Sequence, residues 1–229
     1  TRFGYYADNR LANRTDALGS ITYYSYNALG SLAQIKDGRD HTSNNFYDAA
    51  NRLIASVDNL GYVTHNQYDE NGNIVSQTRF ANPVTPPAFN ATVQPADAAA
   101  PDVTIDAAHD QTTQFGYDAL NQQISRTDGE GHTSLRNYDA VGNLASNIDA
   151  NGNVTRFEYD AVNRMVTEKD ALGNLTHHAY DAVGNLASTE DALGHTTRFA
   201  YDAVNHQVQQ EAADGVKTRV SYDLVGNML

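Results

Sequence analysis

Cysteine and tryptophan are absent from this chain of 229 residues, and proline occurs only five times. Without cysteine there is no disulfide and no thiolate metal site, so the composition leaves the redox compartment open. No apolar run approaches the roughly 18 residues of a membrane-spanning helix, so we expect no membrane-spanning segment. Basic residues are scarce too, since 15 Lys and Arg face 28 Asp and Glu, for a formal net charge of −13. This charge argues against nucleic acid as a partner.

Tyrosine, in contrast, recurs at a fixed interval. Ten tyrosines are spaced by 21 residues, except at one step of 49, which is one repeat plus 28 residues. A period of this length indicates an array of supersecondary units that depend on their neighbours for burial. We therefore expect a single array over residues 1–229, a fragment of a longer chain because it begins and stops in mid-repeat. The repeating residues are Tyr5, Tyr26, Tyr47, Tyr68, Tyr117, Tyr138, Tyr159, Tyr180, Tyr201 and Tyr222.

Each repeat carries two turn signals. One follows the tyrosine, as in Tyr-Asp-Ala-Val-Gly-Asn-Leu at 138–144, and the other is an Asp-x-x-Gly sequence that begins eleven residues after it. Asp bonds to the local backbone, and Gly or Asn tolerates positive φ. The runs between turns are short and partly alternating, as in 155–159. The sequence predicts an all-β fold, a continuous antiparallel β-hairpin meander, either curled into a shell or stacked as a repeat array. Besides the ten tyrosines, we assign structural roles to Gly142, Gly184, Asp149, Asp170, Asp191, Gly173 and Gly194.

A second period overlies the first. Four residues after each tyrosine, Asn and Gly alternate without a break from Asn9 to Gly226, so the duplicated unit is 42 residues. Two interpretations are open. Successive hairpins occupy two different environments, or the alternation is inherited from a duplication and has no structural meaning.

The long step replaces one Asp-x-x-Gly turn with residues 79–110, which contain all five prolines and an Ala-rich segment at 96–100. We expect an extended, poorly ordered loop at a hairpin turn. A tolerated insertion is favoured over a functional loop, and deleting 82–109 should leave the β-fold intact.

Candidate chemistry is sparse. The recurring aspartates suggest a calcium ladder, but calcium loops need several ligands in one short loop, so a turn role is favoured. His177 and His178 are adjacent and should point to opposite faces of a strand, which makes a poor chelate. The tyrosine column could stack on sugars, but a cross-strand ladder with bonded hydroxyls is favoured. We assign no catalytic residue, no metal ligand and no cofactor.

The Tyr-Asp-Ala-x-Gly-Asn-Leu sequence followed by Asp-Ala-x-Gly-Asn-x-Thr-x-x-x-Tyr resembles the YD repeats of the Rhs (rearrangement-hotspot) family. This family also includes cocoon subunits of toxin complexes, wall-associated bacterial proteins and teneurins. The resemblance covers nearly all the chain outside 79–110, with departures at Asp40, Ala212 and Gln207. It implies a long β-meander spiralling into a hollow shell that can enclose a C-terminal toxin. The family's autoproteolytic core motif has no match here.

Two functions compete, and neither is enzymatic. The first is a structural wall of a large secreted or surface bacterial protein, as part of a shell around a C-terminal toxin. The alternative is an extracellular fibre or adhesin segment that binds carbohydrate or cell surfaces. The expected partners are flanking repeats of the same polypeptide or copies of itself, with an encapsulated toxin domain or surface glycans as further candidates.

Overall fold

The structure, a computed structural model, describes residues 1–91, 99–223 and 225–229. In these residues the chain forms nineteen β-strands and no helix, which confirms the predicted all-β class. The chain divides into two compact units, residues 1–133 (unit 1) and residues 134–229 (unit 2). That all ten repeats act as one array over 1–229 stays a prediction.

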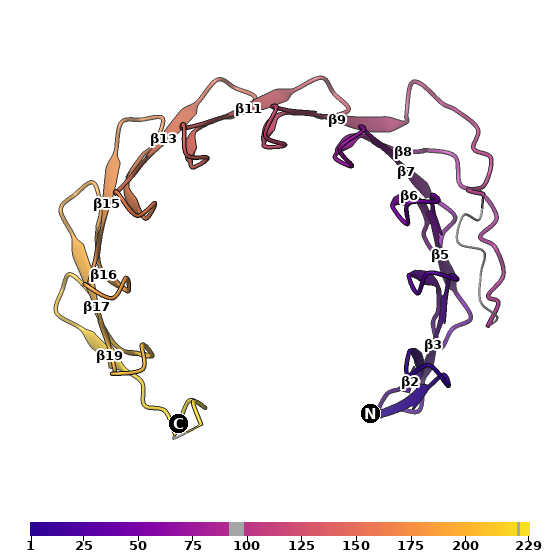
Figure 1. The fold of residues 1–229 in the computed structure, drawn as a ribbon, viewed down its shortest axis with the longest axis horizontal. Helices are drawn as coiled ribbons and strands as arrows, with labels where there is room; N and C mark the ends of the chain where they lie inside the picture. The colour runs from indigo at the N-terminus through magenta and orange to yellow at the C-terminus, as the bar shows by residue number, and fades with distance from the viewer. Residues whose placement is uncertain (92–98, 224) are drawn as a thin grey trace. The chain divides into compact units, whose positions relative to one another are not determined.

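The strands follow the repeat (Figure 1). Unit 1 contains β1 (Arg2–Tyr5), β2 (Leu11–Thr15), β3 (Ile21–Tyr26), β4 (Leu32–Lys36), β5 (Thr42–Tyr47), β6 (Leu53–Val57), β7 (Val63–Tyr68), β8 (Ile74–Arg79), β9 (Gln111–Tyr117) and β10 (Gln123–Thr127). β11 (Thr133–Tyr138) begins at the unit boundary. Unit 2 continues with β12 (Leu144–Ile148), β13 (Val154–Tyr159), β14 (Met165–Lys169), β15 (Leu175–Tyr180), β16 (Leu186–Glu190), β17 (Thr196–Tyr201), β18 (Gln207–Glu211) and β19 (Lys217–Arg219).

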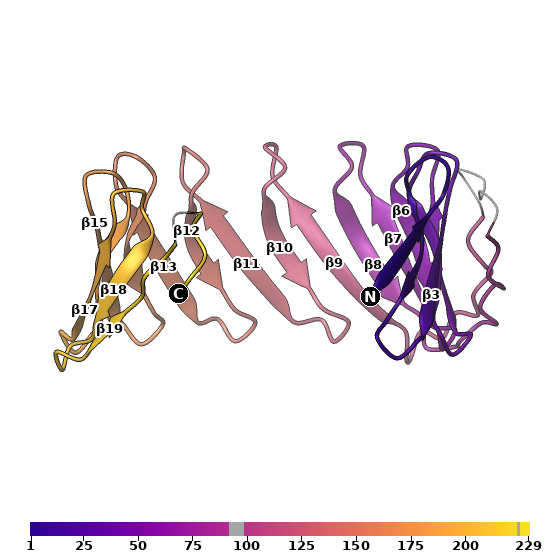
Figure 2. The same cartoon turned by 90° about the horizontal axis from the view of Figure 1, so that it is seen from below.

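Within each unit, every strand pairs in antiparallel orientation with the next strand along the chain. The turns consequently fall at two opposite edges, as Figure 2 shows for the strands of each unit. This is the hairpin meander that the two turn signals per repeat predict.

A β-bulge recurs beside the tyrosines. In β13 and β14, Glu158 pairs with Thr167 but Tyr159 pairs with Met165, so Val166 has no direct partner. Two consecutive apolar residues therefore face one tyrosine, because a bulge sets two residues against one. Strict alternation, which would have placed these two apolar residues on opposite faces, does not hold at this point of the hairpin.

The turns use the positive-φ residues that the sequence provides. After Tyr138, the N–H of Asp139 donates to Asn143 O at 2.9 Å, and Gly142 has φ 94°. Asn163 takes the equivalent position in the following repeat with φ 64°. Asp40, which stands where the pattern has Gly, also adopts a positive φ of 66°. Asn and Gly thus satisfy the same backbone requirement, since both tolerate this region.

The two faces of the sheet differ. We call face A the side that carries Val57, Val63, Arg156 and Lys169, and face B the side that carries the tyrosine column, as the strand register and alternation require. Among the described residues, the buried apolar side chains all lie in unit 1: Ala33, Ala55, Val57, Val63 and Phe80. No described residue of unit 2 is buried. Unit 2 is therefore a single-layer sheet without a core.

The inserted segment supplies the missing layer of unit 1. We call residues 80–110 the strap; the structure describes 80–91 and 99–110 of it. Phe80 packs on Val57 and Val63, and its N–H donates to Val63 O at 2.9 Å. The ring of His65 lies 5.0 Å from that of Phe80, edge to face. Val84 joins the same cluster, so the first turn of the strap closes over β6 and β7.

Farther along, the strap lies over β4 and β5. Gln34 Nε2 donates to Asn44 Oδ1 and, at 3.1 Å, to Ala88 O. Asn44 Nδ2 donates to Pro87 O at 3.3 Å, and the Asn90 N–H donates to Gln34 Oε1 at 2.7 Å. In Figure 1 the described strap runs along the convex side of the strands of unit 1.

The prediction of a poorly ordered loop that only replaces a turn was therefore wrong for the described strap residues. The strap does leave and re-enter at a hairpin turn, since β8 pairs with β9. Its backbone groups, however, pair with side chains of face A. Composition alone predicted a solvated loop, because these contacts join residues up to 56 positions apart and leave no local pattern.

Candidate functional site

The tyrosine column forms a ladder of hydrogen bonds between successive hairpins. In eight repeats the hydroxyl donates to the backbone carbonyl of the residue that opens the second strand of the preceding hairpin, as from Tyr159 to Leu144 O at 3.1 Å. The spacing is 15 residues, or 43 across the strap. The same bond is made by Tyr26, Tyr47, Tyr68, Tyr117, Tyr180, Tyr201 and Tyr222, at 2.8 to 3.3 Å.

The rings are half-buried, which is less than the sequence led us to expect. Tyr5, at the start of the ladder, is 61% exposed. Burial raises the pKa of Tyr159 and of Tyr47, because the phenolate would lose solvation. The hydroxyls thus remain neutral donors. That the ladder carries the stability of the array stays a prediction.

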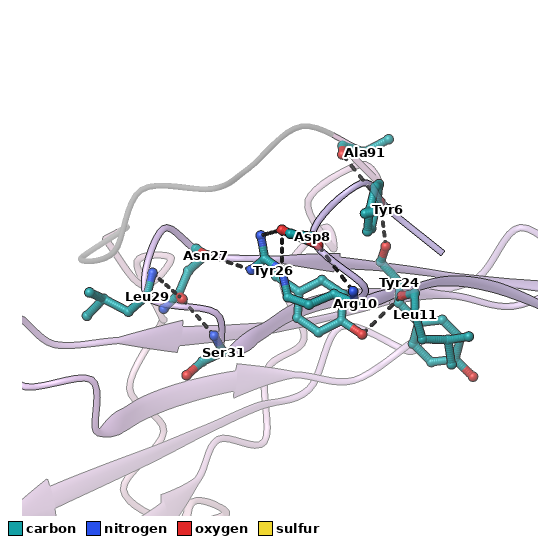
Figure 3. Close-up of polar contacts among 10 residues, drawn as sticks. All are labelled: Tyr6, Asp8, Arg10, Leu11, Tyr24, Tyr26, Asn27, Leu29, Ser31 and Ala91. Atoms are coloured by element: carbon teal, nitrogen blue, oxygen red, sulfur yellow. Dashed lines mark hydrogen bonds and ion pairs between the residues drawn. The ribbon is translucent and has the colours of Figure 1, made fainter. Parts of the chain in front are cut away.

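An arginine stacks on three tyrosines of the column, Tyr26, Tyr68 and Tyr180. In Figure 3, Arg10 Nε donates to Asp8 Oδ2 at 2.8 Å, and its Nη1 donates to Asn27 O at 3.3 Å. The guanidinium lies 4.9 Å from the ring centroid of Tyr26. One side chain therefore ties its own turn to the turn and the ring of the next repeat through charge, hydrogen bonds and a cation–π contact.

This arginine joint recurs at Arg52 and Arg164, and the equivalent position between them is Gln122. Arg164 pairs with Asp160 at 2.6 Å and lies over Tyr180, and its Nη1 donates to Asp181 O at 3.5 Å. In the last copy His206 replaces arginine, with its ring 4.6 Å from that of Tyr222. The distances from the arginine carbon to the ring are 4.8 Å for Arg52 over Tyr68 and 4.7 Å for Arg164 over Tyr180.

The repeats in between use an amide joint. Asn143 Nδ2 donates both to Asp139 Oδ2 and to Asn163 Oδ1, each at 3.0 Å. The acceptor is the positive-φ Asn of the next repeat, a role that Gly cannot fill. The same bond joins Asn73 to Asn121 at 2.8 Å and Asn185 to Asn205 at 3.0 Å. The alternation of Asn and Gly thus has structural meaning, and the interpretation as an inert relic was wrong.

The recurring aspartates hold their turns. Oδ1 of Asp149 accepts from the N–H groups of Asn151 and Asn153 at 2.9 and 2.8 Å, and Oδ2 accepts from Asn153 Nδ2 at 2.7 Å. The side-chain bond from Asn174 holds the pKa of Asp170 below its usual value. In Asp191 the bonds from His195 do the same. These carboxylates are already occupied by donors, which supports the turn role over a calcium ladder.

The two adjacent histidines point apart, as the strand geometry requires. On face A, the cross-strand neighbours of His177 are Thr167 and Glu190. On face B, the cross-strand neighbour of His178 is Thr189. His178 Nδ1 lies 3.3 Å from Thr189 Oγ1. The pair cannot chelate one ion, and the described residues contain no group of three or more metal-ligating side chains.

The fold and these joints define a hairpin-repeat protein in which each repeat is bonded to the next at one edge. The RHS Repeat family model matches residues 47–83, 138–176 and 180–211, so matches fall in both units. These three segments are therefore RHS repeats, the repeats that the tyrosine pattern resembles. No curated protein sequence matches the chain. Among the described residues no helix is long and apolar enough to cross a membrane.

Solved structures share the fold. One is a TcdB2-TccC3 structure without the hypervariable C-terminal region, with a TM-score of 0.65 and 14% identity over 99% of this chain. Another is the Photorhabdus luminescens Tc holotoxin pore with a TccC3 mutation, with a TM-score of 0.64 and 15% identity over 96% of this chain. The chain spans 12% of the length of each of these proteins. At this identity the likeness shows the fold.

Proposed function

We propose that this chain is a non-catalytic wall segment of a large secreted bacterial RHS-repeat protein, part of a shell that encloses a C-terminal toxin. The observation that carries the proposal is the pair of alternating joints. They fix each hairpin to the next in both units, while unit 2 has no core of its own. Such a chain is suited to forming an extended wall whose stability is a sum over neighbours.

The proposed partners follow from this role. Flanking RHS repeats of the same polypeptide continue the wall, because the structurally similar proteins are far longer than this chain. One of these proteins was solved without its hypervariable C-terminal region, and another belongs to a Tc holotoxin pore. An enclosed C-terminal domain is the corresponding partner here.

Two features argue against the alternatives. The hydroxyls of the tyrosine ladder are bonded to backbone carbonyls, so they are not presented to a glycan as an adhesin would require. The turn aspartates, the most regular titratable groups, are likewise occupied within their own turns. Catalysis needs a base or nucleophile that is free to reach a substrate.

Electron cryo-microscopy of the full-length protein that contains this chain tests the proposal. We expect the ten repeats in the wall of a closed chamber, with one face of the sheet lining the interior and density for a separate segment inside. An open fibre in which both faces meet solvent would favour the adhesin instead.

A further inference from the structure

Two cations lie directly opposite each other on face A of unit 2. Arg156 in β13 and Lys169 in β14 are cross-strand partners, and both side chains are exposed. Directly opposed residues have Cβ atoms about 5 Å apart, and like charges at this distance destabilise a sheet. In the strand pairs described for both units, no other direct partners are both Lys or Arg.

In neighbouring hairpins, the residue at the position of Arg156 is paired with a carboxylate instead of a cation. Arg198, one 42-residue period after Arg156, is opposed by Glu211, and His177 is opposed by Glu190. The chain thus has a compensated version of this pair in an equivalent hairpin. With a net charge of −13 it has no shortage of carboxylates, yet neither Arg156 nor Lys169 takes part in an ion pair in the described part of the chain.

A cleft of about 420 Å³ opens beside the two cations. It is lined by the turns that end at Gly152 and Gly173 and by Val154. Asp170 also lines the cleft, but its carboxylate accepts three bonds within its own turn, from Leu172 N–H at 2.9 Å, Asn174 N–H at 2.8 Å and Asn174 Nδ2 at 2.7 Å. It keeps its negative charge at the edge of the cleft, but its oxygens are held by these donors, and in the described part of the chain it forms no ion pair with Arg156 or Lys169.

We propose that this Arg156–Lys169 cleft binds an oxyanion, namely a phosphate, sulfate or carboxylate group. The arginine presents a planar fork that matches two oxygens of such a group, and the lysine adds a second charge. An anion between them converts their repulsion into two attractions, and the cleft provides room for the group on which the anion is carried. The site rests on the charges and the cleft, independently of the wall function.

Titration of the isolated chain with inorganic phosphate, sulfate and glucuronate, each compared with sodium chloride at equal ionic strength, tests the site. Two-dimensional amide NMR should show saturable shifts at the cleft, centred on Asn153 and Gly173. Lys169→Glu copies the compensated hairpin, so it should weaken binding at least tenfold and raise Tm in the absence of anion. Arg156→Gln should weaken binding to a similar extent without adding a carboxylate. The strongest of the three anions identifies the preferred group.

Arg219→Glu is the matched control. It makes the same change of net charge on the same face, opposite the neutral Gln209 and outside the cleft. It should keep the affinity of the unaltered chain. Shifts that sodium chloride reproduces, or that Lys169→Glu and Arg219→Glu reduce equally, would overturn the proposal, since they indicate general screening. Circular dichroism confirms that each variant is folded.

Discussion

Unit 1 and unit 2 are built from the same repeat, but only unit 1 has a second layer. The strap buries Val57 and Val63 of unit 1, whereas the described residues of unit 2 include no buried side chain. Both units keep the tyrosine ladder and the two joints. The difference indicates that the edge joints suffice to specify the hairpin meander, and that a core is a local addition to it.

Equivalent positions on face A differ between the sheet that the strap covers in unit 1 and the uncovered sheet of unit 2. Gln34 and Asn44, which bond to strap carbonyls, correspond in the repeat of Tyr159 to Thr167 and Arg156. Amides can satisfy a covering backbone, whereas a guanidinium requires an anion or water. The covered face is therefore encoded at two or three positions within an otherwise constant repeat.

Among the changes considered, deleting residues 82–109 should lower the stability of unit 1 the most. The strands of unit 1 should persist, but the loss of the strap exposes apolar surface and leaves buried amides without partners. We expect the free energy of unfolding of unit 1 to fall by at least about 3 kcal/mol. Urea denaturation followed by tyrosine fluorescence measures the change. An unaltered midpoint would mean that the strap contributes no stability.

Val63→Ala and Val154→Ala form a matched pair, because both residues precede their tyrosine by five positions. Val63 is completely buried under the strap, so its truncation should cost about 2 kcal/mol. Val154 is half-buried, and its truncation should cost less than about 1 kcal/mol. Equal losses, measured by urea denaturation, would show that the strap does not create a distinct core.

Tyr159→Phe and Tyr47→Phe test the ladder, which the two units share. Each removes one hydroxyl that donates to a carbonyl, at 3.1 Å to Leu144 and at 2.9 Å to Leu32. Each should cost about 1 kcal/mol in the free energy of unfolding. Calorimetry of both variants shows whether the loss of one hydroxyl lowers the free energy of unfolding equally in unit 1, which the strap covers, and in unit 2, which it does not. A loss in one unit alone would contradict the common role.

Arg164→Gln and Arg52→Gln should have the smallest effects. Each removes one half-buried cation–π contact and one ion pair, with an expected cost of about 0.5–1 kcal/mol. The loss should shrink in high salt, because exposed charges are screened. A salt-independent loss would indicate packing of the side-chain stem as the main contribution.

The meander could be predicted because its information is local and repeated ten times. Each turn is specified by an Asp and a positive-φ residue such as Gly142 or Asn163, and the alternation of these two residue types signalled the two joints. The arginine five residues after the tyrosine was a further signal that sequence reasoning missed. It is visible as Arg10, Arg52 and Arg164: the first two are 42 residues apart, and the last two are 112 apart, which is two 42-residue units plus the 28 inserted residues.

The position at which the strap packs on the sheet could not be predicted in the same way. Its contacts, such as that between Asn90 and Gln34, join distant positions and occur once. A single amide in a strand does not indicate what will lie over it. The bulge opposite each tyrosine was also missed, since a period-two pattern cannot register an extra residue in one strand.

The absence of cysteine allows the most direct test of the wall. Ala200 on face A and Thr218 on face B are both exposed, and each can be replaced by a single cysteine in the full-length protein. A maleimide that carries a bulky polyethylene glycol chain then reports which face is accessible. We expect Ala200→Cys to react and Thr218→Cys to be protected, because the face that bears the strap in unit 1 should be the outer one. In the isolated chain both should react. Equal labelling of both positions in the full-length protein would contradict an enclosing wall.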